Sequence, residues 1–438
     1  MKTFTSRLLT LALALLMVLS LVACNKNTNE QGNQGNGNQT TEQDPATDGV
    51  FNAKDYDPKK DYQLPNYREL SIADYVTLGK YKNLTLTLEE KDITITDEVL
   101  QNRIDTILYE KRVEITDRPV AWHDIVVVDY VGKKDGVAFS GGSATNQTIE
   151  VEEENGYIPG FVEGLVGVEL EVATDVPMKF PDNYGNTELA GQEVVFTFTV
   201  HKIESVPELT DEFVAEYTEG EFAEVEAFKA DLLADMNQEA YDAAVRMAFW
   251  TKITENAAVL KYPEDAVMYY YSYYYEMYSY YAAYYGMSLD LFLMYYVGTT
   301  VDALFNACCG FVKEELVYYA VFAAENYQYT DEQYQKALDL YTEKNIDRLN
   351  ELMTSAGKEE YTLEGAKEYF DVEERETIVL QTLEEIAYDD LIQGFTIVVN
   401  PAKKDETTEN NKDNTENGET EEGGDESAES DKTENEQQ

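Results

Sequence analysis

The sequence predicts an α+β protein in which an antiparallel sheet, wrapped on a short helix, is inserted into a mainly α-helical body. Alternating apolar residues indicate strands between residues 124 and 204. From residue 207 to about residue 400, apolar residues instead recur at helical spacing. Because 438 residues exceed one ordinary hydrophobic core, we expect two or three domains.

The charge of the chain excludes two classes of partner. The chain carries 33 basic and 86 acidic residues, for a formal net charge of −53. Such a field repels nucleic acid and anionic head groups, so we expect neither as a partner. The apolar share of 43% predicts a folded body, with disorder confined to particular segments.

Residues 1–24 have the features of an export signal. Lys2 and Arg7 precede an uncharged apolar run over residues 8–22, which is too short for a membrane span. The run ends at Ala23 and Cys24, which look like a bacterial lipobox. Lipid on Cys24 would hold the protein at the outer face of the cell membrane. Ordinary signal cleavage near Ala23, with Cys24 incidental, is the alternative.

Two further segments are predicted to be disordered. Residues 25–65 form a tether, because residues 25–50 are Asn, Gln, Gly and Thr with almost no apolar content. Residues 401–438 form an acidic tail, and from residue 403 onward it is nearly free of apolar side chains.

Residues 66–117 are predicted to belong to the body. Leu84, Leu86 and Leu88 alternate with threonines, as in a half-buried strand. Thr96 then caps a helix whose apolar face includes Ile104 and Leu108.

Residues 207–400 are predicted to be the larger, helical part of the body. Thr330 and Gln333 form a capping box, and a last helix covers residues 384–391 before an extended segment at residues 395–399. Cys308 and Cys309 have no further thiol or histidine cluster near them, so we expect buried residues and no metal site.

A helix bracketed by Pro263 and Gly286 is unusually rich in tyrosine. Tyrosine combines a large apolar surface with a hydroxyl, so an exposed tyrosine face would bind varied unfolded chains. The alternative is that these rings pack the core of the body. The candidate client-binding residues are Tyr270, Tyr274, Tyr278 and Tyr281.

The loop over residues 156–165 sets three bulky apolar side chains among glycines and a proline. Tyr157, Ile158 and Phe161 would either shape a pocket or plug a core. The loop comes in order with "DIVVVDYVG" at residues 124–132, "DGVAFSGG" at 135–142 and "FPDNY" at 180–184. In that order and spacing these motifs resemble the FKBP-type peptidyl-prolyl isomerase domain, in the form carried by trigger factor.

The resemblance implies an isomerase domain over residues 118–206 and a prolyl pocket with no cofactor or metal. The flanks at residues 78–84 and 207–213 also resemble those of the trigger factor domain. Residues of the family's pocket carry over to Tyr130, Phe139, Tyr157, Ile158, Phe161, Tyr184 and Phe196. Ser140 departs from the aspartate of many FKBPs and Ile149 from a frequent aromatic, which implies a weaker isomerase without tight macrolide binding.

The family's basic ribosome-docking domain is not in place before residue 78, so the resemblance implies no ribosome as a partner. We expect an extracytoplasmic isomerase and chaperone acting on unfolded or nascent exported polypeptides with X-Pro bonds. A non-catalytic holdase is the first alternative, and a surface scaffold or adhesin that uses the tyrosine-rich helix is the second. His123 and His201 have no nucleophile beside them in the sequence and are expected to be structural.

Overall fold

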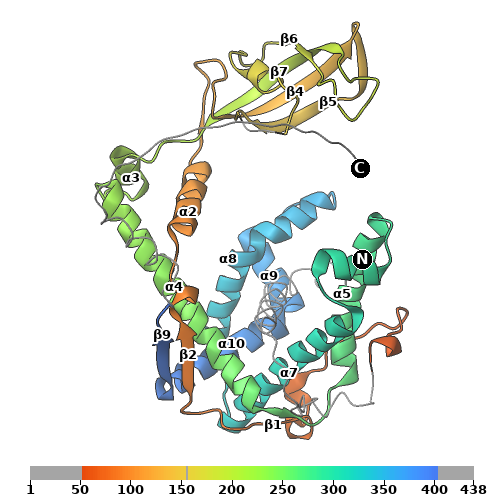
Figure 1. Ribbon diagram of the computed structural model, residues 1–438. Helices are drawn as coiled ribbons and strands as arrows, with labels where there is room; N and C mark the ends of the chain where they lie inside the picture. The colour runs from red at the N-terminus through yellow and green to blue at the C-terminus, as the bar shows by residue number, and fades with distance from the viewer. Residues whose placement is uncertain (1–51, 154–155, 403–438) are drawn as a thin grey trace, which may run out of the picture.

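The computed structural model describes residues 52–153 and 156–402, which form a helical body, an arm and a β-rich domain at the end of the arm (Figure 1). This arrangement confirms the predicted fold class. The signal segment with Cys24, the tether before residue 52 and the acidic tail from residue 403 lie outside the described residues.

The first and last strands of the body pair with each other. Strand β2 (Thr85–Glu89) runs parallel to β9 (Thr396–Asn400), and β1 (Val76–Thr77) is antiparallel to β8 (Ala258–Val259). Leu86 and Leu88 of β2 are buried, which confirms the alternation predicted there. The extended segment predicted near the C-terminal end of the body is β9.

Six long helices build the described part of the body. They are α4 (Val225–Asn256), α5 (Glu264–Tyr284), α7 (Val301–Glu325), α8 (Asp331–Ser355), α9 (Leu363–Glu373) and α10 (Arg375–Leu391). Helix α7 supplies much of the core, and Cys308 and Cys309 are buried in it, as predicted. The capping box at Thr330 is also confirmed.

The prediction for the last helix was too short. Helix α10 begins at Arg375 and not at Glu384, because Ile378 and Val379 are fully buried against the core. Burial of such β-branched residues outweighs their weak helix propensity.

Between α5 and α7 the chain forms the short helix α6 (Leu289–Phe292) and a π-helical turn, η7 (Leu293–Val297). Among the described residues, no single helix is both long and apolar enough to span a membrane. The α6–η7 segment and α7 meet that criterion only as a pair, which is bent by 72°.

The tether prediction was wrong for residues 52–65, because this segment packs on the body. Tyr62 is only 3% exposed, and the ring of Tyr56 lies 4.9 Å from that of Tyr275. These two tyrosines provide enough apolar surface for packing, although the segment is otherwise mostly polar.

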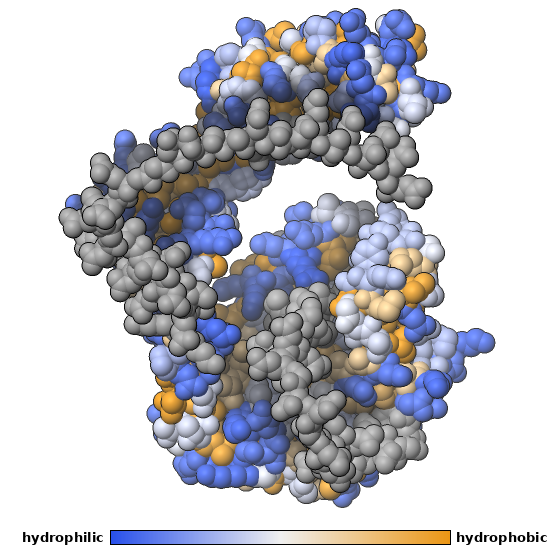
Figure 2. Space-filling view, in the orientation of Figure 1, coloured by the Kyte–Doolittle hydropathy of each residue, from blue (hydrophilic) through white to orange (hydrophobic). Residues whose placement is uncertain are grey.

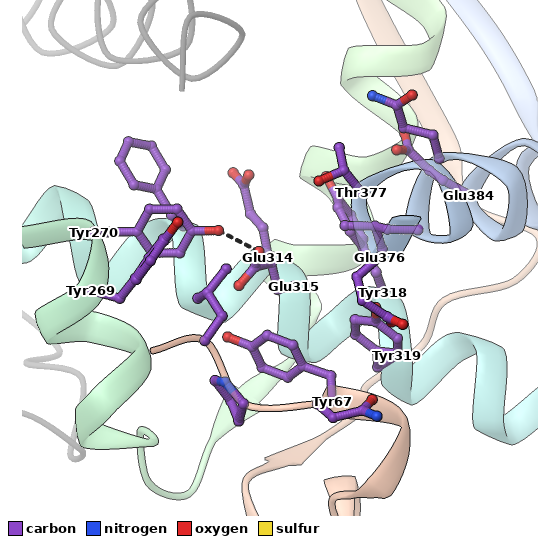
Figure 3. A pocket seen from close by; sticks show the side chains of 16 residues that line it. Tyr67, Tyr269, Tyr270, Glu314, Glu315, Tyr318, Tyr319, Glu376, Thr377 and Glu384 are labelled. Carbon is purple, nitrogen blue, oxygen red and sulfur yellow. Dashed lines mark hydrogen bonds between the residues drawn. The ribbon is translucent and has the colours of Figure 1, made fainter. Parts of the chain in front are cut away.

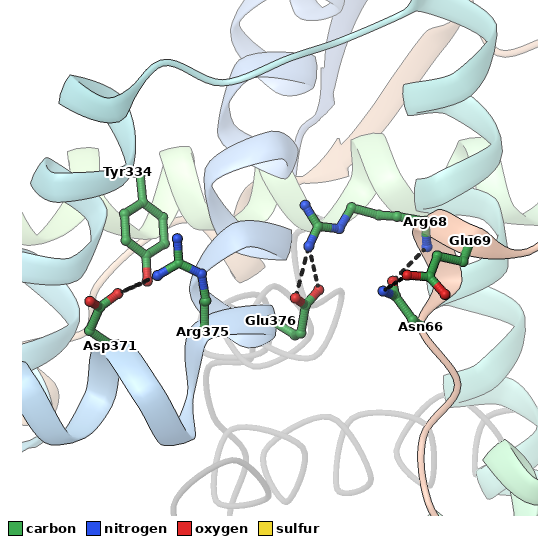
Figure 4. A network of polar contacts seen from close by, with 7 residues as sticks. All are labelled: Asn66, Arg68, Glu69, Tyr334, Asp371, Arg375 and Glu376. Carbon is green, nitrogen blue, oxygen red and sulfur yellow. Dashed lines mark hydrogen bonds and ion pairs between the residues drawn. The ribbon is translucent and has the colours of Figure 1, made fainter.

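Three 3₁₀ turns continue this N-terminal segment: η2 (Ala53–Asp55), η3 (Tyr67–Glu69) and η4 (Ile72–Asp74). The guanidinium of Arg68 donates to both oxygens of Glu376 on α10, at 2.8 and 3.1 Å (Figure 4). The segment is therefore joined to the body by polar as well as apolar contacts.

The arm consists of α2 (Asp97–Glu110), α3 (Asp211–Tyr217) and the first turns of α4 (Figure 1). Ile107, Val214 and Phe228, one from each helix, form a small separate core. Thr96 caps α2 by accepting a hydrogen bond from the Val99 amide, as predicted.

The β-rich domain is a twisted antiparallel sheet. Its strands are β3 (Val113–Glu114), β4 (Asp124–Lys134), β5 (Val137–Glu150), β6 (Thr174–Lys179) and β7 (Glu193–Ser205). The order is β3-β7-β4-β5, with β6 also paired to β7. Asp135 and Gly136, both with positive φ, form the two-residue turn between β4 and β5.

One buried ion pair fixes the start of β4. Asp124 is 1% exposed and accepts two hydrogen bonds from Arg118, at 2.6 and 2.8 Å, and a third from the Ala121 amide. Removing the arginine would leave a buried carboxylate without its counter-charge.

We expect Arg118→Gln to destabilise the β-rich domain by about 2 kcal/mol. A fully buried pair would cost ~3–5 kcal/mol, and the cost is lower here because 37% of the Arg118 side chain is exposed. Urea unfolding followed by the fluorescence of Trp122, in a Trp250→Phe background, measures the effect. Arg103→Gln, at an exposed position on α2, is the matched control. Equal midpoints for the two variants would contradict the prediction.

Candidate functional site

Five of the seven predicted pocket residues form a cluster of touching aromatic rings: Tyr130, Phe139, Tyr157, Phe161 and Phe196. Phe161 lies at its centre, with ring centroids 5.1 Å from Tyr130 and 5.1 Å from Phe196. Phe139 joins through Phe196, at 5.8 Å. Strands β4, β5 and β7 each contribute a ring, so the register of the sheet brings together residues from distant parts of the chain.

The loop that carries Phe161 is held by its own hydrogen bonds. The Phe161 amide donates to the Ile158 carbonyl at 3.1 Å, and the Gly160 amide donates to the Glu163 carboxylate at 2.9 Å. Gly160 has φ +90°, a conformation that favours glycine. The turn η6 (Glu163–Leu165) follows, and Leu165 is fully buried beneath the cluster.

The ring of Phe161 is covered by Tyr157. The two rings stack with centroids 4.6 Å apart and an interplanar angle of 3°. Phe161 is consequently only 3% exposed, whereas Tyr157 is 37% exposed. A prolyl ring can lie on Phe161 only if Tyr157 moves aside.

The remaining predicted residues lie around this centre. Ile158 packs against the cluster as a partly buried side chain. The ring of Tyr184 packs on Phe180, with centroids 4.5 Å apart, and the Phe180 ring lies 5.8 Å from that of Phe139. Tyr184 is 38% exposed, at the rim.

Two glycines make room for Phe139. A Cβ atom on Gly142 would lie 2.4 Å from the Phe139 ring, and one on Gly132 would lie 2.6 Å from it. The spacing of the "DYVG" and "FSGG" motifs therefore has a steric reason.

Sequence reasoning missed two members of the cluster. Phe198 is fully buried with its ring 5.0 Å from Phe161, and Phe180 bridges Phe139 and Tyr184. The signal for Phe198 was its position two residues after Phe196, on the same face of β7.

Burial and the nearby Tyr157 raise the pKa of Tyr130. The hydroxyl of Tyr130 therefore remains a hydrogen-bond donor at neutral pH. Ser140 is exposed on β5, and Ile149 is buried under the cluster with 2% exposure.

Both histidines pair with carboxylates away from the ring contacts. His201 lies between Glu171, at 3.1 Å, and Asp129, at 3.2 Å, and these partners raise its pKa. His123 lies 3.0 Å from Glu152. Within residues 52–153 and 156–402, no group of three or more His, Cys, Asp and Glu side chains is placed to hold a metal ion.

The tyrosine-rich helix, α5, divides between core and surface. Tyr274 is fully buried, which excludes it as a client contact in this structure and corrects that part of the prediction. Its ring packs 6.0 Å from Phe311 of α7. Tyr270 is partly buried with its hydroxyl bonded to Glu315, and Tyr278 is partly buried against the core. Only Tyr281 of the four is exposed, at 46%.

The exposed tyrosines gather at the end of α5 and on η7, a surface that we call the tyrosine tip. Phe292 packs beneath it, with its ring 5.1 Å from that of Tyr296. Figure 2 shows pale and orange residues over this end of α5. The tyrosine tip consists of Tyr280, Tyr281, Tyr284, Tyr285, Tyr295 and Tyr296, which are 46–77% exposed.

Comparison with known proteins identifies the β-rich domain. Residues 117–201 match the family model described as FKBP-type peptidyl-prolyl cis-trans isomerase.

Relatives named trigger factor match a longer part of the chain. That of Latilactobacillus sakei is 33% identical over 279 residues, which cover 60% of this chain and 63% of that protein. That of Bacillus licheniformis is 32% identical over 292 residues, covering 63% of this chain and 66% of that protein. This chain thus spans slightly less than two thirds of these two relatives.

A third relative is covered more fully. The trigger factor of Anoxybacillus flavithermus is 32% identical over 320 residues, which cover 68% of this chain and 70% of that protein. A solved trigger factor chaperone covers 73% of this chain and 72% of that chain at 15% identity. Its TM-score of 0.37 is too low to compare the placement of domains. On the sequence relatives, the chain belongs to the trigger factor family and carries an FKBP-type isomerase domain.

Proposed function

We propose that this protein is a peptidyl-prolyl isomerase and chaperone that assists the folding of exported proteins at the outer face of the cell membrane. The observation that carries the isomerase function is the cluster of Tyr130, Phe161 and Phe196 on an FKBP-type domain. Its clients are unfolded or nascent polypeptides with X-Pro bonds.

Rotation about an X-Pro bond is slow because amide resonance must be broken, with a barrier near ~20 kcal/mol. The twisted amide has a less polar carbonyl group than the planar amide. A dry apolar pocket that binds the twisted form more tightly therefore accelerates rotation. In this proposal the prolyl ring displaces Tyr157 from Phe161, and Tyr130 donates a hydrogen bond to the bound peptide.

The chaperone function would use the tyrosine tip. Figure 2 shows open space between the isomerase domain, the arm and the ends of α8 and α5. A segment held on the tip would remain tethered near the isomerase domain, which raises its effective concentration there. Tyrosine suits such a surface because it gives large contact area at a low entropy cost.

A non-catalytic holdase is the second candidate function. The stacking of Tyr157 on Phe161 favours it, because a pocket whose floor is covered binds prolyl rings weakly. The placement outside the cytoplasm, away from ribosomes, rests on the apolar leader and on Cys24 as a lipidation site.

Tyr157→Ala and Phe161→Leu should change isomerase activity in opposite directions. A stacked aromatic pair is worth about 0.5–1.5 kcal/mol, so freeing the Phe161 ring should raise kcat/KM roughly 2- to 10-fold. Phe161→Leu removes the flat floor and should lower kcat/KM at least ~10-fold. Both are measured on a proline-containing tetrapeptide, with Val137→Ala, at an exposed position in the same domain, as the control.

A loss of activity in Tyr157→Ala would show that this ring is a wall of the pocket and not its cover. Peptide binding without catalysis, in the unmutated protein and in Tyr157→Ala alike, would favour the holdase.

Removing the tyrosine tip should weaken the chaperone function alone. We expect the triple variant Tyr284→Ser, Tyr295→Ser and Tyr296→Ser to need several times more protein to suppress aggregation of an unfolded client. Its activity on the tetrapeptide should not change, because the tip lies outside the isomerase domain (Figure 1). The control variant replaces Leu340, Leu363 and Val372, which are 55–74% exposed elsewhere on the body, by serine. Equal suppression by the two triple variants would exclude the tip as the client surface.

Cys24→Ser should release the protein from the membrane. Fractionation of the expressing bacterium should find the unmutated protein with the membrane, labelled by radioactive palmitate, and the variant unlabelled in the soluble fraction. A variant that stays with the membrane and takes up label would contradict lipidation at Cys24.

A further inference from the structure

Residues 52–74, which we call the strap, lie on the body as an irregular chain with three short 3₁₀ turns (Figure 1). Outside these turns the strap has no regular secondary structure. It is mostly polar, carries tyrosines five or six residues apart and includes two X-Pro bonds. The strap thus has the composition and conformation of an unfolded polypeptide bound to a folded surface.

Tyrosine side chains hold the first half of the strap on α5. The ring of Tyr56 lies 5.5 Å from that of Tyr271 and 4.9 Å from that of Tyr275. The Tyr56 hydroxyl donates to Glu276 at 3.2 Å. Tyr62, whose ring stacks on Tyr56 at 5.9 Å, is buried.

Tyr67 holds the second half of the strap on α7. Its ring stacks on that of Tyr319, with centroids 5.2 Å apart and an interplanar angle of 13°. Figure 3 shows its hydroxyl turned toward Glu315, to which it is hydrogen-bonded. Both halves of the strap are therefore bound through aromatic rings with a carboxylate beside the hydroxyl.

Two ion pairs add to the ring contacts. Lys60 pairs with Asp265 of α5 at 2.7 Å, and Arg68 pairs with Glu376 of α10 at 2.8 Å (Figure 4). In both pairs the strap supplies the cation and the body supplies the carboxylate. The surface under the strap therefore attracts a chain segment with basic residues.

The backbone of the strap is independent of the body. Within the described residues, its hydrogen bonds to other backbone groups stay inside residues 52–75, such as that from the Lys60 amide to the Asp57 carbonyl at 3.0 Å. The first contact of this kind with the body is made by the Tyr75 carbonyl, which accepts from the Leu260 amide at 2.7 Å. The strap can therefore leave the surface by a local opening that breaks side-chain contacts alone.

The strap leaves part of the surface beside it unfilled. A cavity of about 410 Å³ lies next to residues 64–67, between α5, α7 and α10 (Figure 3). Tyr269, Tyr318 and Leu380 line this cavity, and Leu64 in its wall remains 37% exposed. A segment with a larger apolar side chain at this place would gain contacts that the strap lacks.

The surface under the strap continues into the tyrosine tip along α5. Tyr271 and Tyr275 meet the strap, and Tyr285 of the tip lies 14 residues after Tyr271. Because 14 residues complete nearly four helical turns, these positions share one side of the helix, over a rise of about 21 Å. A polypeptide held at the tip can reach the strap with about six extended residues.

We propose that the surface of α5, α7 and α10 under the strap is a binding groove for unfolded polypeptides, that the strap fills it in the free protein, and that a client displaces the strap. The segments that fit the groove carry tyrosines five or six residues apart with a lysine or arginine nearby, as the strap does. This inference extends the proposed chaperone function and rests on it.

Hydrogen exchange of the full chain measures the displacement. The client is lysozyme unfolded by reduction and carboxamidomethylation, a basic polypeptide that the acidic body does not repel. At saturation with this client, the amides of residues 52–70 should exchange at least ~10-fold faster, because their protection depends on the docked strap. The amides of β2 and β9 should not change.

Tyr56→Ala should tighten client binding roughly 10-fold, because it removes two ring contacts of the strap and leaves the groove intact. Lys60→Gln should tighten it about 1.5- to 5-fold, the usual effect of one exposed ion pair. The matched controls are Tyr361→Ala, at a partly buried tyrosine outside the strap, and Lys252→Gln, whose pair with Glu255 is about as exposed as that of Lys60. Fluorescence anisotropy of the labelled client gives the affinities. A purely structural role of Tyr56 would weaken client binding or leave it unchanged.

A fluorescent peptide with the sequence of residues 52–74 tests the groove without a client. It should bind the double variant Tyr56→Ser and Tyr62→Ser at least ~10-fold more tightly than the unmutated protein, whose own strap competes with it. Tyr56→Ala takes the place of the double variant if that protein does not fold.

Three results would overturn the proposal. They are unchanged exchange of the strap amides when the client is bound, a client affinity of Tyr56→Ala no higher than that of Tyr361→Ala, and equal binding of the peptide by the variant and the unmutated protein. Absence of client binding to every one of these proteins would instead overturn the chaperone function. Binding of the peptide would then still support a groove for chain segments, and its absence would overturn the groove as well.

Discussion

The parallel pairing of β2 with β9 joins residues 85–89 to residues 396–400, and the placement of every described element between them depends on it. A two-stranded ladder is marginal by itself. Here Leu86 and Leu88 bury one face of β2 in the core of the body. The Asn400 side chain and the Ala402 amide then donate to Glu89 and Glu90 at 2.8 Å, which secures the ladder beyond its last pair. All the elements from α2 to α10 therefore lie in the chain between two strands that pair with each other.

The isomerase domain is in turn inserted between α2 and α3 of the arm. The two segments that connect it to the arm run side by side. Val113 of β3, which follows α2, pairs with Ser205 of β7, which precedes α3. The arm has its own small core around Val214, separate from the larger core of the body. A domain joined by adjacent ends can fold as a unit and tolerates a change of position relative to its host.

Local signals predicted much of the fold, and tertiary contacts decided the rest. The caps at Thr96 and Thr330 and the alternation along β2, β4 and β7 depend on neighbouring residues, so the sequence was enough to predict them. Whether a tyrosine on α5 is buried or exposed depends on which other elements pack against it. Tyr274 meets Phe311 and is buried, whereas Tyr284, ten residues later, extends past α7 and is 77% exposed. Likewise the motif placed Tyr157 at the pocket, but only the structure shows its ring stacked on Phe161.

Some of the 34 tyrosines donate hydrogen bonds to carboxylates, which greatly outnumber the basic residues. With 86 acidic and 33 basic residues, most carboxylates have no cation available, and a partly buried one needs another donor. Tyrosine hydroxyls supply such donors: Tyr270 donates to Glu315 at 2.5 Å. Tyr81 and Tyr334 donate at 2.6 Å to Glu325 and Asp371, each of which also pairs with a basic residue. Phenylalanine at position 270 would pack as well but would remove this hydrogen bond from Glu315.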